Sequence, residues 1–180
     1  VHAPQYAFRG MCMDLELMDW LNQYTFPEEE KYTNLDYAKK AYSIFTNALK
    51  KSATTRACIF ATRHRDATVL LMELMEETGL VSYVGKVNMD REASKALIEE
   101  SAEASAYNTF GWINSVNNKF QNTKPILTPR FIPCCTDELM EELKQIQMTY
   151  GIPVQSHLSE SPGEIEFVKF LRPNNEFYGD

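Results

Sequence analysis

Two kinds of apolar pattern alternate along this chain. Stripes in which apolar residues recur every three to four positions predict amphipathic helices, at residues 36–49, 66–78, 136–150 and 165–171. Short runs rich in β-branched and aromatic residues lie between these stripes and predict strands, at residues 54–60, 82–87, 124–128 and 154–157, the last of them buried. Helices that alternate with strands in this way are typical of a parallel sheet. The pattern therefore predicts an α/β fold with parallel strands.

Three segments fit the alternation less regularly. Val1 and His2 read as the end of a further strand. Residues 15–21 are apolar on most sides and predict a short buried helix, which Pro27 is expected to end, and the acidic run at 28–30 is interpreted as solvated. Residues 91–120 are predicted to be helical, either continuously or in two pieces. The chain thus predicts one strand end and four full strands, closed by a last helix.

Two parallel architectures compete for this pattern, a doubly wound open sheet and a (β/α)8 barrel. The chain contains neither Gly-x-Gly-x-x-Gly nor Gly-x-x-x-x-Gly-Lys, so a nucleotide-binding open sheet loses support. A complete barrel needs about 250 residues, whereas this chain has 180. We therefore expect a partial (β/α)8 TIM-type barrel that runs from the end of strand 1 to strand 5. Residues 1–180 are then the N-terminal half of a barrel domain, without its later strands.

Composition and charge narrow the classes of partner. Hydrophobic residues make up 44% and charged residues 24% of the chain, as in an ordinary soluble globular protein. The net charge of -7 argues against a nucleic-acid backbone or an anionic membrane surface as partner. The four cysteines form no Cys-x-x-Cys pair, so a thiolate zinc site is not expected. These features favour a reduced, cytoplasmic protein.

Polar side chains follow several of the predicted strands, and in a parallel barrel these strand ends meet on one face. They are His2, Gln5, His64, Arg130, His157 and Glu160. The last two precede a capping box, with Ser161 at the N-cap and Glu164 at N3, which opens the final helix. Neutral imidazoles bind metals, carboxylates move protons, and an arginine with an amide recognises a planar polar ligand. Two histidines, a glutamine, an arginine and a glutamate that converge there predict a metal-assisted hydrolytic site for a polar, planar ligand.

Each of these residues also has a simpler interpretation. His64 lies between Arg63 and Arg65, which favours a loop residue or a support for the site over a metal ligand. Arg130 on its own is more often a surface or salt-bridged arginine, and Glu160 would then be a solvated carboxylate at a polar strand end.

Five segments together resemble the guanine deaminase family of the amidohydrolase superfamily, in the same order and at similar spacing. They are Val1-His2-Ala3-Pro4-Gln5-Tyr6, Asp19-Trp20-Leu21 with Tyr24-Thr25-Phe26-Pro27, Val84-Gly85-Lys86-Val87-Asn88-Met89-Asp90, Thr128-Pro129-Arg130-Phe131 and Gln155-Ser156-His157-Leu158-Ser159-Glu160. The resemblance covers nearly the whole chain and is weakest over residues 91–122.

The resemblance implies a fold, a reaction and a set of roles. The family folds as a metal-containing (β/α)8 barrel with a small β-sandwich, and it hydrolyses guanine to xanthine and ammonia in purine catabolism or salvage. One zinc ion per active site is implied, with His2 and His157 among its ligands. His157 and Glu160 are then catalytic, with Glu160 as the proton shuttle, and Gln5, Arg130 and Phe131 contact the purine. For the complete protein we expect a small-molecule purine as ligand and a homodimer as assembly.

The chain also departs from the family pattern. The first histidine of the family's His-x-His motif, its sixth-strand histidine, its eighth-strand aspartate and its β-sandwich do not appear in these 180 residues. We therefore expect this chain alone to be inactive. Two alternatives stay open: another amidohydrolase, such as a cytosine or chlorotriazine-type hydrolase, or a non-catalytic half-barrel interaction module. The cytidine-deaminase type of zinc site is not favoured, because Pro133-Cys134-Cys135 lacks the required Pro-Cys-x-x-Cys.

Overall fold

Helices and strands alternate along residues 1–179, which are the residues that this computed structural model describes. The long helices are α3 (Leu35–Lys50), α4 (Arg65–Thr78), α5 (Ala102–Val116), α6 (Asp137–Tyr150) and α7 (Pro162–Leu171). The strands are β1 (Arg56–Phe60), β2 (Val81–Gly85), β3 (Val87–Asn88), β4 (Thr123–Pro125) and β5 (Thr128–Pro129). Shorter helical segments are η1 (Pro4–Phe8), α1 (Leu17–Trp20), η2 (Leu21–Thr25), α2 (Phe26–Glu30), η3 (Lys31–Thr33) and η4 (Ile132–Cys134).

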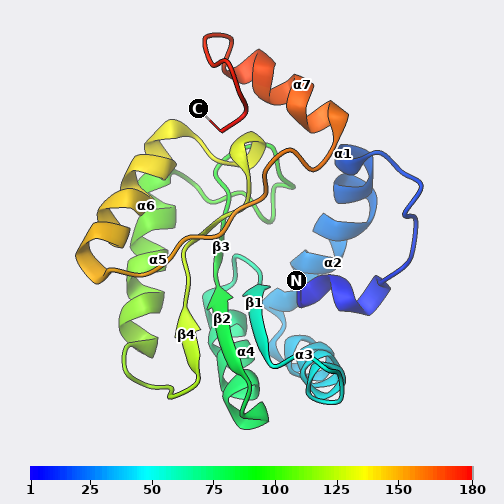
Figure 1. The fold of residues 1–180 in the computed structure, drawn as a ribbon, viewed down its shortest axis with the longest axis vertical. Helices are drawn as coiled ribbons and strands as arrows, with labels where there is room; N and C mark the ends of the chain where they lie inside the picture. The colour runs from blue at the N-terminus through cyan, green and yellow to red at the C-terminus, as the bar shows by residue number, and fades with distance from the viewer. Residues whose placement is uncertain (180) are drawn as a thin grey trace.

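The strands pair in parallel and in chain order. Strands β1, β2 and β4 form one sheet in that order, and β3 pairs with β5 just beyond it (Figure 1). Single parallel bridges extend the array on both sides, from His2 to Phe60 and from Leu127 to Val154. Five parallel strand positions thus follow one another, as expected for part of a (β/α)8 barrel.

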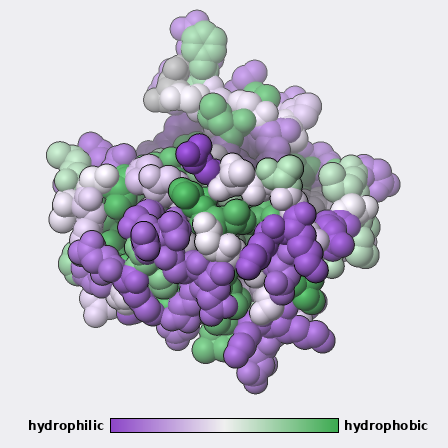
Figure 2. Space-filling model, turned by 60° about the horizontal axis from the view of Figure 1, so that its bottom comes forward, coloured by the Kyte–Doolittle hydropathy of each residue, from purple (hydrophilic) through white to green (hydrophobic). Residues whose placement is uncertain are grey.

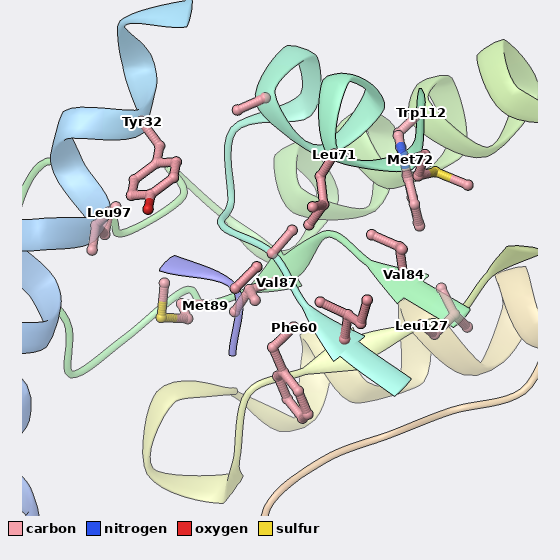
Figure 3. Packing of buried hydrophobic residues seen from close by; sticks show 14 of the residues in the cluster. Tyr32, Phe60, Leu71, Met72, Val84, Val87, Met89, Leu97, Trp112 and Leu127 are labelled. Atoms are coloured by element: carbon pink, nitrogen blue, oxygen red, sulfur yellow. The ribbon is translucent and has the colours of Figure 1, made fainter. Parts of the chain in front are cut away.

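The core lies between the strands and the helices that connect them. Leu71 and Met72 of α4 and Trp112 of α5 are fully buried in the same cluster as Val84 of β2 (Figure 3). In β1 and β2 the last two residues of each strand are buried. The C-terminal ends of the strands are therefore rigidly held, and these ends carry the polar side chains of the predicted site.

Local signals set the helix ends. Asn34 caps α3 by accepting hydrogen bonds from the backbone N–H groups of Asp36 and Tyr37. Gly79 and Gly151 end α4 and α6 in the left-handed conformation, with φ of 75° and 64°. The predicted capping box of α7 is confirmed, because Ser161 and Glu164 bond to each other's backbone N–H groups.

The prediction for residues 15–30 was wrong in three respects. The short helix α1 was expected to be buried, but none of its residues is. Pro27 does not end the helix, because a π-helical turn allows the Phe26 N–H to donate to the carbonyl of Leu21 and the chain continues into α2. The acidic run is not solvated, since Glu28 and Glu29 are buried.

Two further segments differ from the prediction. Residues 91–101 are not helical, because the Glu99 carboxylate is drawn into the core by a 2.7 Å bond from the Lys86 ammonium, and α5 starts only at Ala102. The segment at Val154 is no buried strand: it makes a single bridge, and Val154 is 44% exposed. Leu127 pairs with it on one side, and no strand within residues 1–179 pairs with its other side.

The surface is mostly polar. Seen from below, hydrophilic side chains cover much of the molecule, with smaller hydrophobic areas between them (Figure 2). None of the helices within residues 1–179 is both long enough and apolar enough to span a lipid bilayer.

Candidate active site

One cleft of about 890 Å³ opens at the C-terminal ends of the strands and brings the predicted site residues together. Its lining includes His2, Gln5, Arg130, Phe131, His157 and Glu160. These residues come from both ends of the strand array and are up to 158 positions apart in the sequence, so only the parallel topology joins them. His64 does not line this cleft.

His2 and His157 meet at the floor of the cleft. His2 is held beside β1, because the N–H of Phe60 donates to the carbonyl of Val1 at 2.9 Å and the N–H of Ala3 donates to the carbonyl of Phe60 at 3.0 Å. The Nε2 atoms of His2 and His157 lie 2.8 Å apart, and the His2 ring stacks on Phe60 at 4.4 Å between ring centroids. The two imidazoles are therefore hydrogen-bonded to each other through their Nε2 atoms.

Hydrogen bonding fixes the proton of His157. Its Nδ1 lies 2.7 Å from the carbonyl oxygen of Arg130, which can only accept, so Nδ1 carries the hydrogen. In the neutral ring, Nε2 then carries the lone pair that accepts the hydrogen bond from Nε2 of His2, and the same lone pair can bind a metal in place of that bond.

His2 is also held in the neutral form. Burial lowers the pKa of His2 well below 6.5, and the positive charge of Arg130 and the ring of His157 lower it further. Its Nδ1 is buried and has no hydrogen-bond partner within the described chain. Two imidazole Nε2 atoms this close together are ligands of the kind that zinc takes, so these residues fit part of a zinc site. Residues 1–179 contain no cluster of three or more His, Cys, Asp or Glu side chains that could complete it.

Arg130 is a buried, ion-paired residue of the cleft wall. Its Nη1 donates to both carboxylate oxygens of Glu29, at 2.9 and 2.8 Å, and the two side chains are 2% and 0% exposed. Its guanidinium carbon lies 5.2 Å from the centre of the Phe26 ring. The simpler interpretation of Arg130 as a salt-bridged arginine therefore holds for Nη1. Nε and Nη2 donate to no group within residues 1–179.

Sequence reasoning missed Glu29, since it lies within an acidic run. A usable signal was its helical register, because Leu21, Thr25 and Glu29 recur every four residues and all three are buried.

Gln5 and Phe131 flank the histidines. Gln5 lies on η1, is partly exposed, and its amide bonds to no group in the described part of the chain. Phe131 is buried, and its ring meets the His157 ring edge-on at 6.5 Å. Gln5 thus gives the cleft an amide without a hydrogen-bond partner in the described residues, and Phe131 gives it an aromatic surface.

Glu160 lies at the mouth of the cleft and is exposed. Its backbone N–H donates to the buried Glu164 carboxylate at 2.6 Å, and Tyr178 donates to the other oxygen of Glu164. Ser159 just before it adopts a left-handed conformation with φ of 56°. The backbone is therefore held in place, while the Glu160 carboxylate bonds to no group in residues 1–179.

His64 belongs to a different environment. It stands at the N-cap position of α4, and its Nε2 is buried without a partner in the described residues. Burial, and then the charge of Arg63, lower its pKa to about 4. This agrees with the interpretation of His64 as a loop or supporting residue.

Comparisons with known proteins agree in sequence and in structure. A sequence model of the amidohydrolase family matches residues 1–175. Guanine deaminase from Rattus norvegicus is 41% identical over 181 residues, which cover 100% of this chain and 40% of that protein. A crystal structure of guanine deaminase from C. acetobutylicum, with guanine bound in the active site, is 46% identical with a TM-score of 0.95, covering 99% of this chain and 42% of the other.

A more distant structure shares the fold alone. An atrazine chlorohydrolase from Arthrobacter aurescens, in complex with zinc, is 15% identical with a TM-score of 0.76, over 96% of this chain and 42% of its own. This chain thus spans about 40% of the length of the relatives that it matches.

Proposed function

Because the chain belongs to the amidohydrolase family, we propose that it is the N-terminal half of the barrel domain of an enzyme that hydrolyses guanine to xanthine and ammonia. The observation that carries this proposal is the single cleft that contains all six predicted site residues, in a chain 46% identical to a guanine deaminase solved with guanine. The fold prediction of a partial (β/α)8 barrel is confirmed by the same structural match.

His2 and His157 are the residues that would hold a zinc ion, through their Nε2 atoms. When bound, zinc lowers the pKa of water towards about 7 and so supplies hydroxide at neutral pH. The carbonyl of Arg130 orients His157 for this role and fixes its tautomer. Catalytic zinc sites usually have three protein ligands, so we propose that further ligands come from the part of the relatives that this chain does not span.

Glu160 is the proposed proton shuttle. Its carboxylate is exposed to the cleft and has no partner within residues 1–179, so it is free to accept the proton of the attacking water. It can deliver that proton to a ring nitrogen as the carbon that bears the amino group is attacked. The same carboxylate can then take a second proton, from the hydroxyl group that has been added to the carbon, and pass it to the amino group, so that the C–N bond breaks with release of ammonia as the carbonyl of xanthine forms. The anchored backbone at Glu160 keeps this movement local to the side chain.

The polar groups of guanine match the remaining cleft residues. Guanine O6 is an acceptor, and the Nε and Nη2 donors of Arg130 are uncommitted within the described chain. The N1–H of guanine needs an acceptor, which the amide oxygen of Gln5 supplies. Phe131 provides an apolar boundary for the planar ring.

The nearest rival substrates belong to other amidohydrolases. The zinc-bound chlorotriazine hydrolase is only 15% identical to this chain, against 46% for the guanine-bound structure. We therefore propose guanine rather than a chlorotriazine or cytosine. We further propose a homodimeric, cytoplasmic enzyme of purine catabolism, without nucleic-acid or membrane partners.

The test measures zinc content and guanine turnover together, on this 180-residue chain and on a longer protein that also spans the remaining length of its relatives. We expect about one zinc per site and equal yields of xanthine and ammonia from the longer protein only. Turnover of cytosine or a chlorotriazine but not guanine would contradict the substrate. Absence of both metal and turnover in the longer protein would contradict the enzyme and favour a non-catalytic interaction module.

A further inference from the structure

The carboxylate of Glu29 lies against the guanidinium of Arg130 in the wall of the candidate cleft. Both carboxylate oxygens accept from the same nitrogen, Nη1, at 2.9 and 2.8 Å. The sulfur of Met89 lies 3.7 Å from that nitrogen. Nη1 is thus fully engaged on one side of the guanidinium, and the pair is almost completely buried.

The rest of the guanidinium remains available. Arg130 lines the cleft, and its Nε and Nη2 donate to no group within the part of the chain that the structure describes. The planar guanidinium cannot turn without breaking both bonds to Glu29, so the free edge keeps one direction. Glu29 therefore decides where these donors point.

Glu29 also sets the charge that a ligand meets. The one buried positive charge at this wall is matched by one buried negative charge in direct contact. A ligand oxygen that approaches the free edge meets strong donors, but an anionic ligand also brings a second negative charge close to Glu29. In a buried site this repulsion is weakly screened. The pair is accordingly suited to a neutral carbonyl.

We propose that Glu29 is a positioning and specificity-determining residue: it orients Arg130 and neutralises its charge, so that the cleft favours neutral over anionic oxopurines. This inference rests on the proposed function, because it takes an oxopurine as the ligand. Glu29 would lower the affinity of the cleft for oxopurines that carry a negative charge, relative to neutral ones. The acceptor positions of such ligands can be the same as those of guanine, so shape alone would not exclude them.

The test compares two ligands that have no amino group to lose: hypoxanthine, which is neutral at pH 7, and urate, which is a monoanion. Binding of each is measured by calorimetry or by competition with guanine, on the longer protein that contains this chain. For Glu29→Gln we expect hypoxanthine to bind more weakly and urate more tightly, with the ratio of their dissociation constants shifting by about tenfold. A merely structural loss would weaken both ligands alike and leave the ratio unchanged, which would overturn the inference.

Glu28→Gln is the matched control. Glu28 is also buried on α2, but it bonds to Lys31 and Tyr37 rather than to Arg130. We expect the ligand ratio of this variant to equal that of the parent. A tenfold shift in both variants would point to general loosening of α2 and would contradict a specific role for Glu29.

Glu29→Asp separates charge from placement and serves if Glu29→Gln does not fold. It keeps the negative charge with a shorter reach, so hypoxanthine should weaken while the ratio stays near the parent value. A shift towards urate in Glu29→Asp would overturn the charge argument. Guanine turnover of the parent is measured in the same preparation: its absence contradicts the proposed function, whereas normal turnover with an unchanged ratio in Glu29→Gln contradicts this inference alone. Failure of the parent to bind hypoxanthine would contradict both.

Discussion

Two carboxylates at the same cleft have opposite environments. Glu29 is buried, bonded through both oxygens and paired with a cation. Glu160 is exposed, and its carboxylate bonds to no group within residues 1–179. The carboxylate of Glu29 is therefore held in place by its partner, whereas the carboxylate of Glu160 is not. The two environments suit the two proposed roles, placement for Glu29 and chemistry for Glu160.

The surroundings of each carboxylate explain the difference. Glu29 lies on α2, whose buried face places it against the core beside Phe26. Glu160 follows a left-handed residue and precedes the Ser161 cap, so its backbone is fixed while its side chain stays exposed at the mouth of the cleft. The loop thus combines an ordered backbone with an unpaired side chain, which is what a proton shuttle requires.

The largest expected effect is on catalysis. In the longer protein that contains this chain, Glu160→Gln removes the proposed proton acceptor and keeps the shape, so kcat for guanine should fall by about 10²- to 10⁴-fold with little change in KM. Steady-state release of ammonia measures this. Glu166→Gln, an exposed residue of α7, is the control and should behave as the parent. If Glu160→Gln kept its kcat, another group would be the shuttle.

The next effect is on stability. Here the larger effect is expected at Glu29 and the smaller one at Glu160. Glu29→Ala leaves Arg130 buried without its partner and should lower the free energy of unfolding by about 3–5 kcal/mol. Glu160→Ala should change it by no more than about 0.5 kcal/mol. Denaturant unfolding of both variants measures the difference. Equal losses would show that the ion pair does not stabilise the fold.

A smaller effect is expected at Gln5, which is uncommitted like Glu160 but carries no charge. In the longer protein, Gln5→Leu removes the proposed hydrogen bond to the substrate, worth about 0.5–1.5 kcal/mol, so KM should rise by about 2- to 10-fold. The value of kcat should change little. A loss confined to kcat would instead place Gln5 at the reacting atoms.

The smallest effect concerns His64, whose Nε2 is buried, as Glu29 is. Its pKa is about 4, lowered from 6.5 by burial and then by Arg63, with Lys86 lowering it further and the Glu29 backbone and Glu30 acting in the opposite direction. The unfolded chain therefore binds a proton before the folded chain does, so stability is lost as the pH falls from 6.5 to about 4.

His64→Asn removes this titrating group. The unfolding free energy should then depend less on pH in that window, and the change in slope should correspond to less than one bound proton. Urea unfolding at several values between pH 7 and about 4.5 measures the slope. An unchanged slope in the variant would mean that His64 titrates alike in both states.

The sequence predicts best what local chemistry decides. Ser161 and Glu164 form their capping box within four residues, and Gly79 and Gly151 end their helices through their own conformational freedom. Five of the six cleft residues were also identifiable, because they follow strands whose ends must meet in a parallel array, whereas Phe131 was singled out only by the family resemblance. Their roles stay predictions.

Long-range electrostatics decides what the sequence does not show. Residues 28–30 look like a solvated acidic run until Arg130, about a hundred positions away, pairs with Glu29. In the same way, residues 91–101 leave the helical pattern because Glu99 reaches Lys86 in the core. Neither partner can be assigned from the neighbouring residues, since the pairing depends on the fold.

The most direct test of the two roles is steady-state kinetics of Glu160→Gln and Glu29→Gln, side by side, with guanine. The account predicts that the Glu160 variant loses kcat and keeps KM, while the Glu29 variant raises KM and keeps most of its kcat. Loss of kcat alone in both variants, or the reverse split, would contradict the assignment of chemistry to Glu160 and placement to Glu29.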